Sequence, residues 1–407
     1  MNLAHKNCKK NSPVAAVYLH IPFCQHKCPF CSFAVIRDRE RFHEKYILGM
    51  IDEIKKRAEW MGAKQSFYDK KYTGQKLLKS IYFGGGTPSS LRITEVDILL
   101  SQVRNFFPCS DDIEISFEMN PEDVNPEYLC GLAEIGVTRI SLGGQSFQSL
   151  SLKKLGRLHS VLELRKAVKD IICSAINNWN IDLMFGIPEQ SITMFKKDVE
   201  EALSYNPSHI SLYGLEIHEK TPFGKNKQII KWDSEHQQQY EEMYLWAIER
   251  LEKSGLFQYE VSNFSKKNME SFNNLLVWSG NEYLGFGVGA HSYVSQTRWS
   301  NKRSLKIYQK HLEENTWPVE FEEQLQQKEL AAESLMLALR QTKGINVEQW
   351  QTRFGSLWEN QQFDILNELC DTGRAFWKGQ QLCLTSKGML LADRITVELM
   401  PPSISKL

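Results

Sequence analysis

The 407-residue sequence lacks both a net charge and a long apolar run. Lys and Arg together number 49, as do Asp and Glu, so no overall basic charge favours nucleic acid as a partner. No apolar run is long enough to span a bilayer. The first thirteen residues lack the apolar core of a secretory signal, and they also lack arginine, which counts against a transit peptide. We therefore expect a cytoplasmic protein without a transmembrane segment.

Paired cysteine spacings are scarce as well. The chain has nine cysteines, an odd number, and six of them are scattered without a pattern: Cys8, Cys109, Cys130, Cys173, Cys370 and Cys383. This usage excludes a disulfide framework and is typical of a reducing compartment. Tandem repeats and low-complexity segments are absent too.

The other three cysteines, Cys24, Cys28 and Cys31, form a CxxxCxxC motif directly after an apolar run. Three thiolates can hold three irons of a cubane 4Fe–4S cluster. The fourth iron then stays open to a small molecule such as S-adenosylmethionine, and this combination is a route to radical chemistry. The alternative is a structural zinc site, which usually needs four ligands in CxxC pairs, and no second pair follows.

Short strand and helix candidates alternate along the first half of the chain. Strands are predicted at residues 14–21, 80–83, 113–119, 139–142, 180–184 and 209–215, and helices at 41–60, 94–106, 126–135 and 193–205. Alternating strands and helices predict an α/β fold with a parallel sheet. Six such units indicate an open or partial (β/α)6 barrel.

One face of these strands is polar. In the third strand, Ile115 and Phe117 alternate with Ser116 and Glu118, and a side-chain period of two places each pair on its own face. Fully buried parallel strands are usually apolar throughout. We therefore expect a polar binding cavity inside the barrel; the alternative is an antiparallel sheet with one solvated face.

Length predicts two or three domains. We divide the chain into a polar N-terminal tail (1–13), the partial barrel (14–235), a barrel extension with a charged connector (236–318) and a C-terminal α+β domain (319–407). The last range has helix candidates at 327–340, 363–370 and 385–397 around a strand pair at 375–377 and 381–384, which is typical of a winged-helix-like module. Because the chain is neutral, we expect this module to pack against its neighbour rather than bind DNA.

Two glycine-rich runs stand out. Gly84, Gly85 and Gly86 follow the second strand, where glycines let a backbone approach a ligand closely. A second run, residues 285–291, either passes close to a flat ligand or packs tightly against another strand. It ends in His291, which together with His20 is a candidate iron or porphyrin ligand; a structural role is the alternative for each.

The motifs resemble the radical S-adenosylmethionine superfamily and, within it, the oxygen-independent coproporphyrinogen III oxidase-like group. The resemblance runs from about residue 14 to the C-terminus and rests on YLHIPFC, GGGTPS, FEMNPE, RISLGGQSF, LGRLHS, IDLMFGIPEQS, YEVSNF and YLGFGVGAHS. It implies a 4Fe–4S cluster on Cys24, Cys28 and Cys31. It also implies S-adenosylmethionine bound near Tyr18, Phe30, Gly85, Gly86, Thr87, Glu118, Gln145, Arg157 and Asp182.

The group has two branches. Coproporphyrinogen dehydrogenases resemble CxxxCxxCxC and carry a longer N-terminal extension; here Phe33 takes the fourth cysteine position, and about a dozen residues precede the first strand. Both features resemble the HemW-type haem chaperones. That resemblance implies haem binding, transfer of haem to an unidentified acceptor protein and an electron donor for the cluster; a homodimer stays open.

Two other functions remain as alternatives. One is oxidative decarboxylation of coproporphyrinogen III in porphyrin biosynthesis, as a radical oxidoreductase. The other is radical chemistry on an unrelated substrate, because the family pattern His-Asn-x-x-Tyr-Trp is broken: Asn273 replaces the histidine and Val277 the tyrosine. The haem ligand is therefore undefined. Gly144, where the family pattern has valine, is expected to affect packing only.

Overall fold

The computed structural model describes residues 14–37, 40–61, 77–355 and 358–400, so the predicted polar tail, residues 1–13, lies outside the described residues. A twelve-stranded sheet is the centre of the fold, in the order β14-β13-β12-β11-β1-β4-β5-β6-β7-β8-β10-β9. Its six middle strands are β1 (Ala16–Ile21), β4 (Leu78–Gly85), β5 (Cys109–Met119), β6 (Arg139–Gln145), β7 (Asn178–Phe185) and β8 (His209–Gly214). All five pairings among them are parallel, which confirms the predicted partial barrel.

Further strands extend both edges of the barrel. On one edge β11 (Tyr283–Phe286) pairs in parallel with β1, and β12 (His291–Val294), β13 (Thr297–Asn301) and β14 (Val319–Gln324) follow as antiparallel neighbours. On the other edge β10 (Asn263–Ser265) and β9 (Phe257–Gln258) continue the sheet antiparallel to β8. The edge strands were not among the six predicted strands, because they are short; only the structural alternative for the second glycine run implied a strand there.

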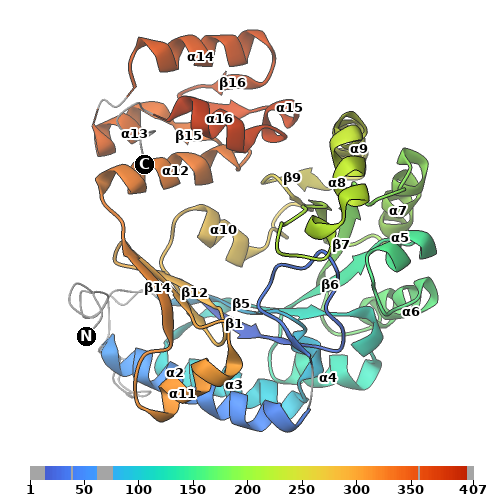
Figure 1. Ribbon diagram of the computed structural model, residues 1–407, viewed down its shortest axis with the longest axis vertical. Coiled ribbons are helices and arrows are strands. Elements are labelled where there is room, and N and C mark those ends of the chain that lie inside the picture. The colour runs from blue at the N-terminus through green and yellow to red at the C-terminus, as the bar shows by residue number, and fades with distance from the viewer. Residues whose placement is uncertain (1–13, 38–39, 62–76, 356–357, 401–407) are drawn as a thin grey trace.

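Helices cover the outer face of the sheet (Figure 1). They are α2 (His43–Trp60), α3 (Ile93–Phe106), α4 (Pro126–Glu134), α5 (Ser149–Lys154), α6 (Val161–Ile172), α7 (Ile192–Ser204) and α9 (Gln237–Glu252). The helix α8 (Lys227–Glu235) has no buried residue and contacts the 3-10 helix that precedes it. The four predicted helices are confirmed as α2, α3, α4 and α7. Leu19, Phe83 and Phe117 are fully buried under them, and burial of each such side chain contributes roughly 1.5–3 kcal/mol.

The inner face of the barrel strands is polar, as predicted. Tyr18, Tyr82, Glu118 and Asp182 alternate with the buried apolar residues of their strands and so lie on the opposite face from the helices. The helices between the barrel strands cover the apolar face of the sheet. The polar face of the sheet therefore lines the lumen.

The C-terminal residues form a second unit with its own core, drawn in orange and red in Figure 1. Its elements are α12 (Gln327–Leu339), β15 (Ile345–Asn346), α13 (Val347–Phe354), α14 (Asn360–Asp371), β16 (Ala375–Lys378), β17 (Gln381–Leu384), α15 (Ser386–Met389) and α16 (Ala392–Leu399). The small sheet has the order β15-β17-β16. Leu335, Trp350 and Leu366 lie in this separate core. The sequence of helix, strand, two helices and a strand pair is winged-helix-like, as predicted.

Two details differ from the expected layout. The charged stretch expected as a connector contains α11 (Leu305–Glu313), whose Tyr308 and Leu312 are buried against α2. Strand β14 belongs to the large sheet, so the second core begins with α12. The proposed domain ranges otherwise remain predictions.

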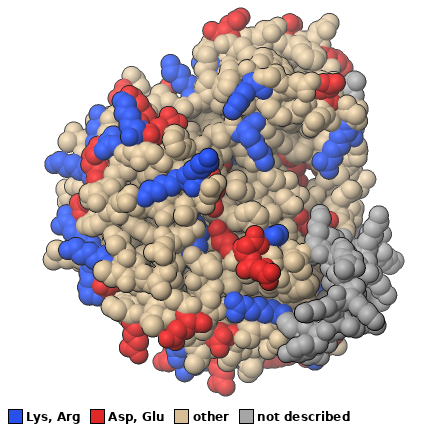
Figure 2. All heavy atoms as spheres, turned by 180° about the vertical axis from the view of Figure 1, so that it is seen from behind, with Lys and Arg blue, Asp and Glu red and all other residues tan. Residues whose placement is uncertain are grey.

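The remaining elements are short. They are β2 (Phe23–Cys24), β3 (Ile36–Arg37), α10 (Phe272–Trp278) and the 3-10 helices Glu40–Phe42, Pro88–Ser90, Pro121–Asp123 and Phe223–Lys225. Within the described ranges, no helix has the length and apolar character that a membrane crossing requires. Acidic and basic side chains are interspersed over the face shown in Figure 2, as the balanced composition leads one to expect.

Candidate functional site

The three motif cysteines lie in one loop after β1. Cys24 ends β2, which pairs in parallel with β3 and so closes the loop that carries the other two. Inside the loop the Cys31 amide donates to the Cys28 carbonyl at 3.1 Å. All three thiols are partly exposed and free of disulfide bonds. The fold therefore places all three in one loop that follows β1.

Three thiols are the donor set that soft metals prefer. Burial raises the pKa of the Cys24 thiol to about 11 and also raises the pKa of Cys31, so both favour the protonated form unless a coordinated metal deprotonates them. No three His, Cys, Asp or Glu side chains of the described chain converge so as to hold a single ion. A cubane cluster needs no such convergence, since each thiolate binds a different iron. The donor set fits that group.

The triglycine run packs closely beneath the cysteine loop. The Gly86 amide donates to the Ile21 carbonyl at 2.7 Å, and a Cβ at Gly86 would lie 2.8 Å from the carbonyl carbon of Pro22. Gly85 has φ +116°, and a Cβ there would lie 2.6 Å from the His20 ring. The glycines were predicted to let the backbone approach a ligand closely. In the structure they approach the chain's own residues, and these contacts hold the start of the cysteine loop in place.

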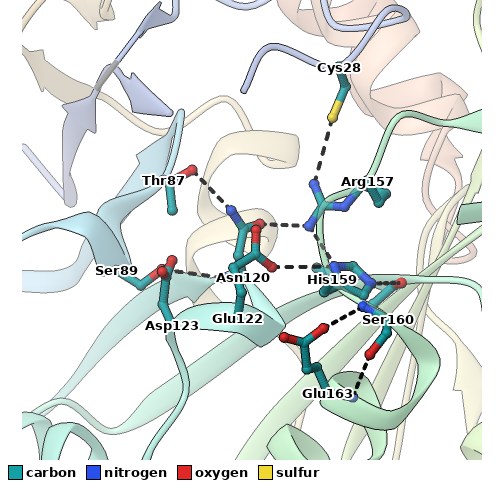
Figure 3. A network of polar contacts seen from close by, with 12 residues as sticks. Cys28, Thr87, Ser89, Asn120, Glu122, Asp123, Arg157, His159, Ser160 and Glu163 are labelled. Atoms are coloured by element: carbon teal, nitrogen blue, oxygen red, sulfur yellow. Dashed lines mark hydrogen bonds and ion pairs between the residues drawn. The ribbon is translucent and has the colours of Figure 1, made fainter. Parts of the chain in front are cut away.

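Arg157 joins the cysteine loop to the barrel (Figure 3). Its Nη2 donates to Asn120 Oδ1 at 2.7 Å and to the Gly143 carbonyl at 3.1 Å, while its Nη1 lies 3.9 Å from Cys28 Sγ. Asn120 Nδ2 donates to Thr87 Oγ1 at 3.1 Å, and that hydroxyl lies 3.3 Å from Cys24 Sγ. A continuous polar chain thus links two of the three thiols.

A buried histidine supports the segment that carries Arg157 (Figure 3). His159 Nδ1 lies 3.3 Å from Glu122 Oε2, and its Nε2 lies 3.2 Å from the Gly144 carbonyl oxygen. Burial opposes ionisation of Glu122, yet its contact with His159 holds its pKa below the usual range. Sequence reasoning gave no role to Asn120, Glu122 and His159, although they stand in the motifs FEMNPE and LGRLHS.

Two carboxylates face the lumen. Glu118 accepts from Tyr82 OH at 2.8 Å and from the Gly85 amide at 3.1 Å. Burial raises its pKa to about 7 despite these hydrogen bonds. Asp182, two strands away, accepts from Asn180 Nδ2 at 2.7 Å, and burial raises its pKa as well. At neutral pH Glu118 is therefore poised between its two protonation states.

The other predicted residues lie on barrel strands and in the cysteine loop. Tyr18 lies on β1, and Gln145 ends β6 with φ +66°. Phe30 belongs to the cysteine loop, and its ring centroid is 6.3 Å from that of Phe223. These three positions remain predictions for S-adenosylmethionine, as do the glycines, Thr87, Glu118, Arg157 and Asp182.

His20 has a structural role. Its Nδ1 lies 3.2 Å from Tyr18 OH, and its Nε2 lies 3.0 Å from the Ala34 carbonyl oxygen, which only an N–H can satisfy. Burial lowers its pKa to about 4, so the ring is neutral. Both nitrogens are occupied, and of the two candidate histidines only His291 remains for an iron.

Comparison with known proteins identifies the family. The radical SAM superfamily model matches residues 18–202. The chain is 32% identical over 385 residues to the haem chaperone HemW of Bacillus subtilis, covering 93% of this chain and 97% of that one. The HemW of Lactococcus lactis is also 32% identical over 385 residues, covering 93% and 96%.

A solved structure shares the fold. Coproporphyrinogen III oxidase HemN from Escherichia coli, a radical SAM enzyme, superposes with a TM-score of 0.80 at 20% identity, covering 98% of this chain and 92% of that one. At this identity the match shows a shared fold only. The 32% identity to the HemW sequences across nearly the whole chain shows the family: the chain belongs to the HemW family of radical SAM proteins.

Proposed function

We propose that the protein is a haem chaperone that binds haem and transfers it to an acceptor protein. In this proposal Cys24, Cys28 and Cys31 hold a 4Fe–4S cluster that binds S-adenosylmethionine exchangeably. One observation carries the proposal: a cavity of about 400 Å³ opens in the lumen, and its wall includes Ser32 and Phe33, which directly follow the last cysteine of the loop. A cavity of this size is in the range of small-molecule and cofactor sites.

The chain's own side chains divide the task of holding S-adenosylmethionine. The ionised Glu118 carboxylate accepts hydrogen bonds from an ammonium group, and the Arg157 guanidinium attracts a carboxylate. Asp182 accepts from ribose hydroxyls, while Tyr18 and Phe30 offer apolar surface. When bound, the cluster supplies one-electron chemistry at its open iron.

Phe33 favours cargo binding over decarboxylation. It stands where the dehydrogenase pattern has a fourth cysteine, and 62% of the residue is exposed beside the lumen cavity. A phenyl ring offers no iron ligand, but it offers flat apolar surface to a porphyrin. Haem in this proposal is cargo, so the protein needs to bind it without transforming it.

The experiment is an anaerobic haem titration of the cluster-reconstituted protein, followed by difference absorbance. We expect saturation at one haem per chain and passage of that haem to an apoprotein acceptor such as apomyoglobin. A parallel incubation with coproporphyrinogen III, S-adenosylmethionine and a reductant should leave the substrate's carboxyl groups intact. Decarboxylation of coproporphyrinogen III without saturable haem binding would contradict the proposed chaperone function and would indicate an oxidase.

A further inference from the structure

We propose that haem binds in a groove between α10, β12 and α12, with His291 as its axial ligand. The inference rests on the proposed function, because it names the place and the ligand of the haem that a chaperone would carry. It follows from the arrangement of two cavities, from the state of the His291 ring and from the charges around the groove.

Two cavities meet at His291. The first, of about 400 Å³, lies in the lumen and is lined by residues of β1, α10 and the segment after the cysteine loop. The second, of about 410 Å³, lies between the barrel edge and α12 of the C-terminal unit. Val277, Tyr283 and His291 line both cavities. A flat ligand lying across this shared wall would contact the barrel and the C-terminal unit at once. Figure 1 shows α10 between these two parts of the molecule.

The backbone holds His291 firmly at this place. His291 begins β12, and Gly285 on β11 approaches it so closely that a Cβ there would collide with the His291 carbonyl oxygen. The next residue, Ser292, accepts from the Gly285 amide at 2.9 Å. The second glycine run therefore packs two strands together, as the structural alternative for it predicted, and thereby presents the histidine to the groove.

The His291 ring is in the form that binds iron. The residue is exposed, and no hydrogen bond to its imidazole is made by the described part of the chain. Although part of the residue is exposed, partial desolvation of the ring and the nearby Arg303 and Arg298 lower its pKa, so the imidazole is neutral at physiological pH, which is the form that coordinates metals. In contrast, His20 in the same cavity has both nitrogens engaged.

The α10 wall offers no competing ligand. Asn273 and Val277 both line the lumen cavity, as residues four apart on one helix face should. Asn273 Oδ1 accepts from Ser80 Oγ at 3.4 Å, and neither an amide nor an isopropyl group is a good iron ligand. A histidine at position 273 would, however, present an imidazole to the same cavity.

The rim of the groove suits two propionates. Arg303 lines the lumen cavity, and Arg298, Lys343 and Arg353 line the outer one, whose acidic lining residue is Glu333. Arg298 is paired with Glu323 at 2.7 Å and lies 3.7 Å from Glu333, which leaves three cations for a dianionic ligand. Burial lowers the pKa of Lys343, and a carboxylate beside it would favour its charged form.

The test compares His291→Ala with His218→Ala, an exposed histidine that lines neither cavity. Haem is titrated anaerobically into each variant, and the iron–histidine stretch of the ferrous complex is recorded by resonance Raman spectroscopy. We expect His291→Ala to weaken haem binding more than about tenfold, as losses of metal-site partners do, and to abolish the stretch. His218→Ala should match the unchanged protein in both.

A rescue variant guards against a folding artefact. His291→Ala combined with Asn273→His should regain an iron–histidine stretch and at least part of the affinity, while the cluster iron content stays constant in all variants. If the unchanged protein binds one haem and His291→Ala binds it equally with the same stretch, the ligand assignment is wrong although the chaperone proposal stands. If the unchanged protein binds no haem, both fail.

Discussion

The two walls of the lumen are built differently. On the cluster wall, Arg157, Asn120 and Thr87 form a chain of hydrogen bonds that reaches the cysteine loop. On a second wall, between α10 and β12, the cavities are lined by Val277 and by the exposed ring of His291. If the proposed function holds, the contrast teaches how a resident group and a cargo differ: a network of polar contacts positions a cofactor, whereas a roomy wall with one open ligand lets a cargo leave.

The largest expected effect is on the cluster wall. Cys28→Ala removes one of the three proposed thiolate ligands, so the reconstituted protein should lose its brown charge-transfer absorbance and its bound iron and sulfide. Cys173→Ala, at an exposed thiol, is the matched control and should keep both. Haem stoichiometry should survive in the two variants; a simultaneous loss of haem in Cys28→Ala would break the separation of the walls.

The second change tests the support of the cargo wall. Leu335 is fully buried on α12, in the C-terminal core, and Leu335→Ala should cost about 2–5 kcal/mol of unfolding free energy. Asp364→Ala, on the exposed side of α14, should stay within about 0.5 kcal/mol. We expect chemical denaturation to show this loss, with weaker haem binding and an unchanged cluster. Loss of the cluster in Leu335→Ala would show that the two walls depend on each other for their stability, contrary to this prediction.

The third change, at Glu118, tests how the cluster wall binds S-adenosylmethionine. Glu118 must be ionised to accept from an ammonium group, and burial raises its pKa to about 7. The affinity for S-adenosylmethionine should therefore rise as the pH increases through about 7. Glu118→Gln should weaken binding roughly 10- to 100-fold above that pH, as loss of a charge-assisted hydrogen bond does. Calorimetric titrations across the pH range would refute this role if the Glu118→Gln variant kept both the affinity and the pH profile of the unchanged protein.

The same carboxyl makes a stability prediction. Its folded-state pKa lies above the usual value of 4.5, so between about 4.5 and 7 the folded protein binds more protons than the unfolded one. Stability should then fall as the pH rises through this window. Glu118→Gln should remove that part of the slope, which urea unfolding at a series of pH values would reveal.

The smallest expected effect concerns Arg157. Arg157→Lys keeps the charge but loses the planar fork that reaches Asn120 and Gly143 together. We expect about tenfold weaker S-adenosylmethionine binding and a shifted electron paramagnetic resonance spectrum of the reduced cluster. Arg165→Lys, at a surface pair with Glu201, is the control. Identical behaviour of the two variants would show that the network in Figure 3 does not act on the cluster.

Much of the fold could be predicted because its local patterns agree with its tertiary structure. The six barrel strands follow directly from period-two alternation, and α2, α3, α4 and α7 from their helical apolar spacing. The edge strands β9 to β14 could not be predicted, because they are short and are defined by pairing with distant strands. The stretch around Tyr308 looked like a connector for the same reason: its partner, α2, lies far away in sequence.

The candidate site divides in the same manner. The cysteine loop is local, so its spacing alone predicts it. The network of Asn120, Glu122 and His159 could not be predicted, since each residue gains its role from a contact across the barrel. Likewise, nothing local separates His20 from His291; only the structure shows that one ring is fully engaged and the other faces a cavity.

We propose that cluster and haem occupy different walls of one lumen, and magnetic coupling tests this arrangement most directly. The reduced, cluster-loaded protein is measured by electron paramagnetic resonance without haem, with one equivalent of ferrous haem, and after carbon monoxide makes that haem diamagnetic. We predict that ferrous haem speeds the relaxation of the cluster signal and that carbon monoxide reverses the change. One haem bound per chain with no effect on cluster relaxation would contradict the account.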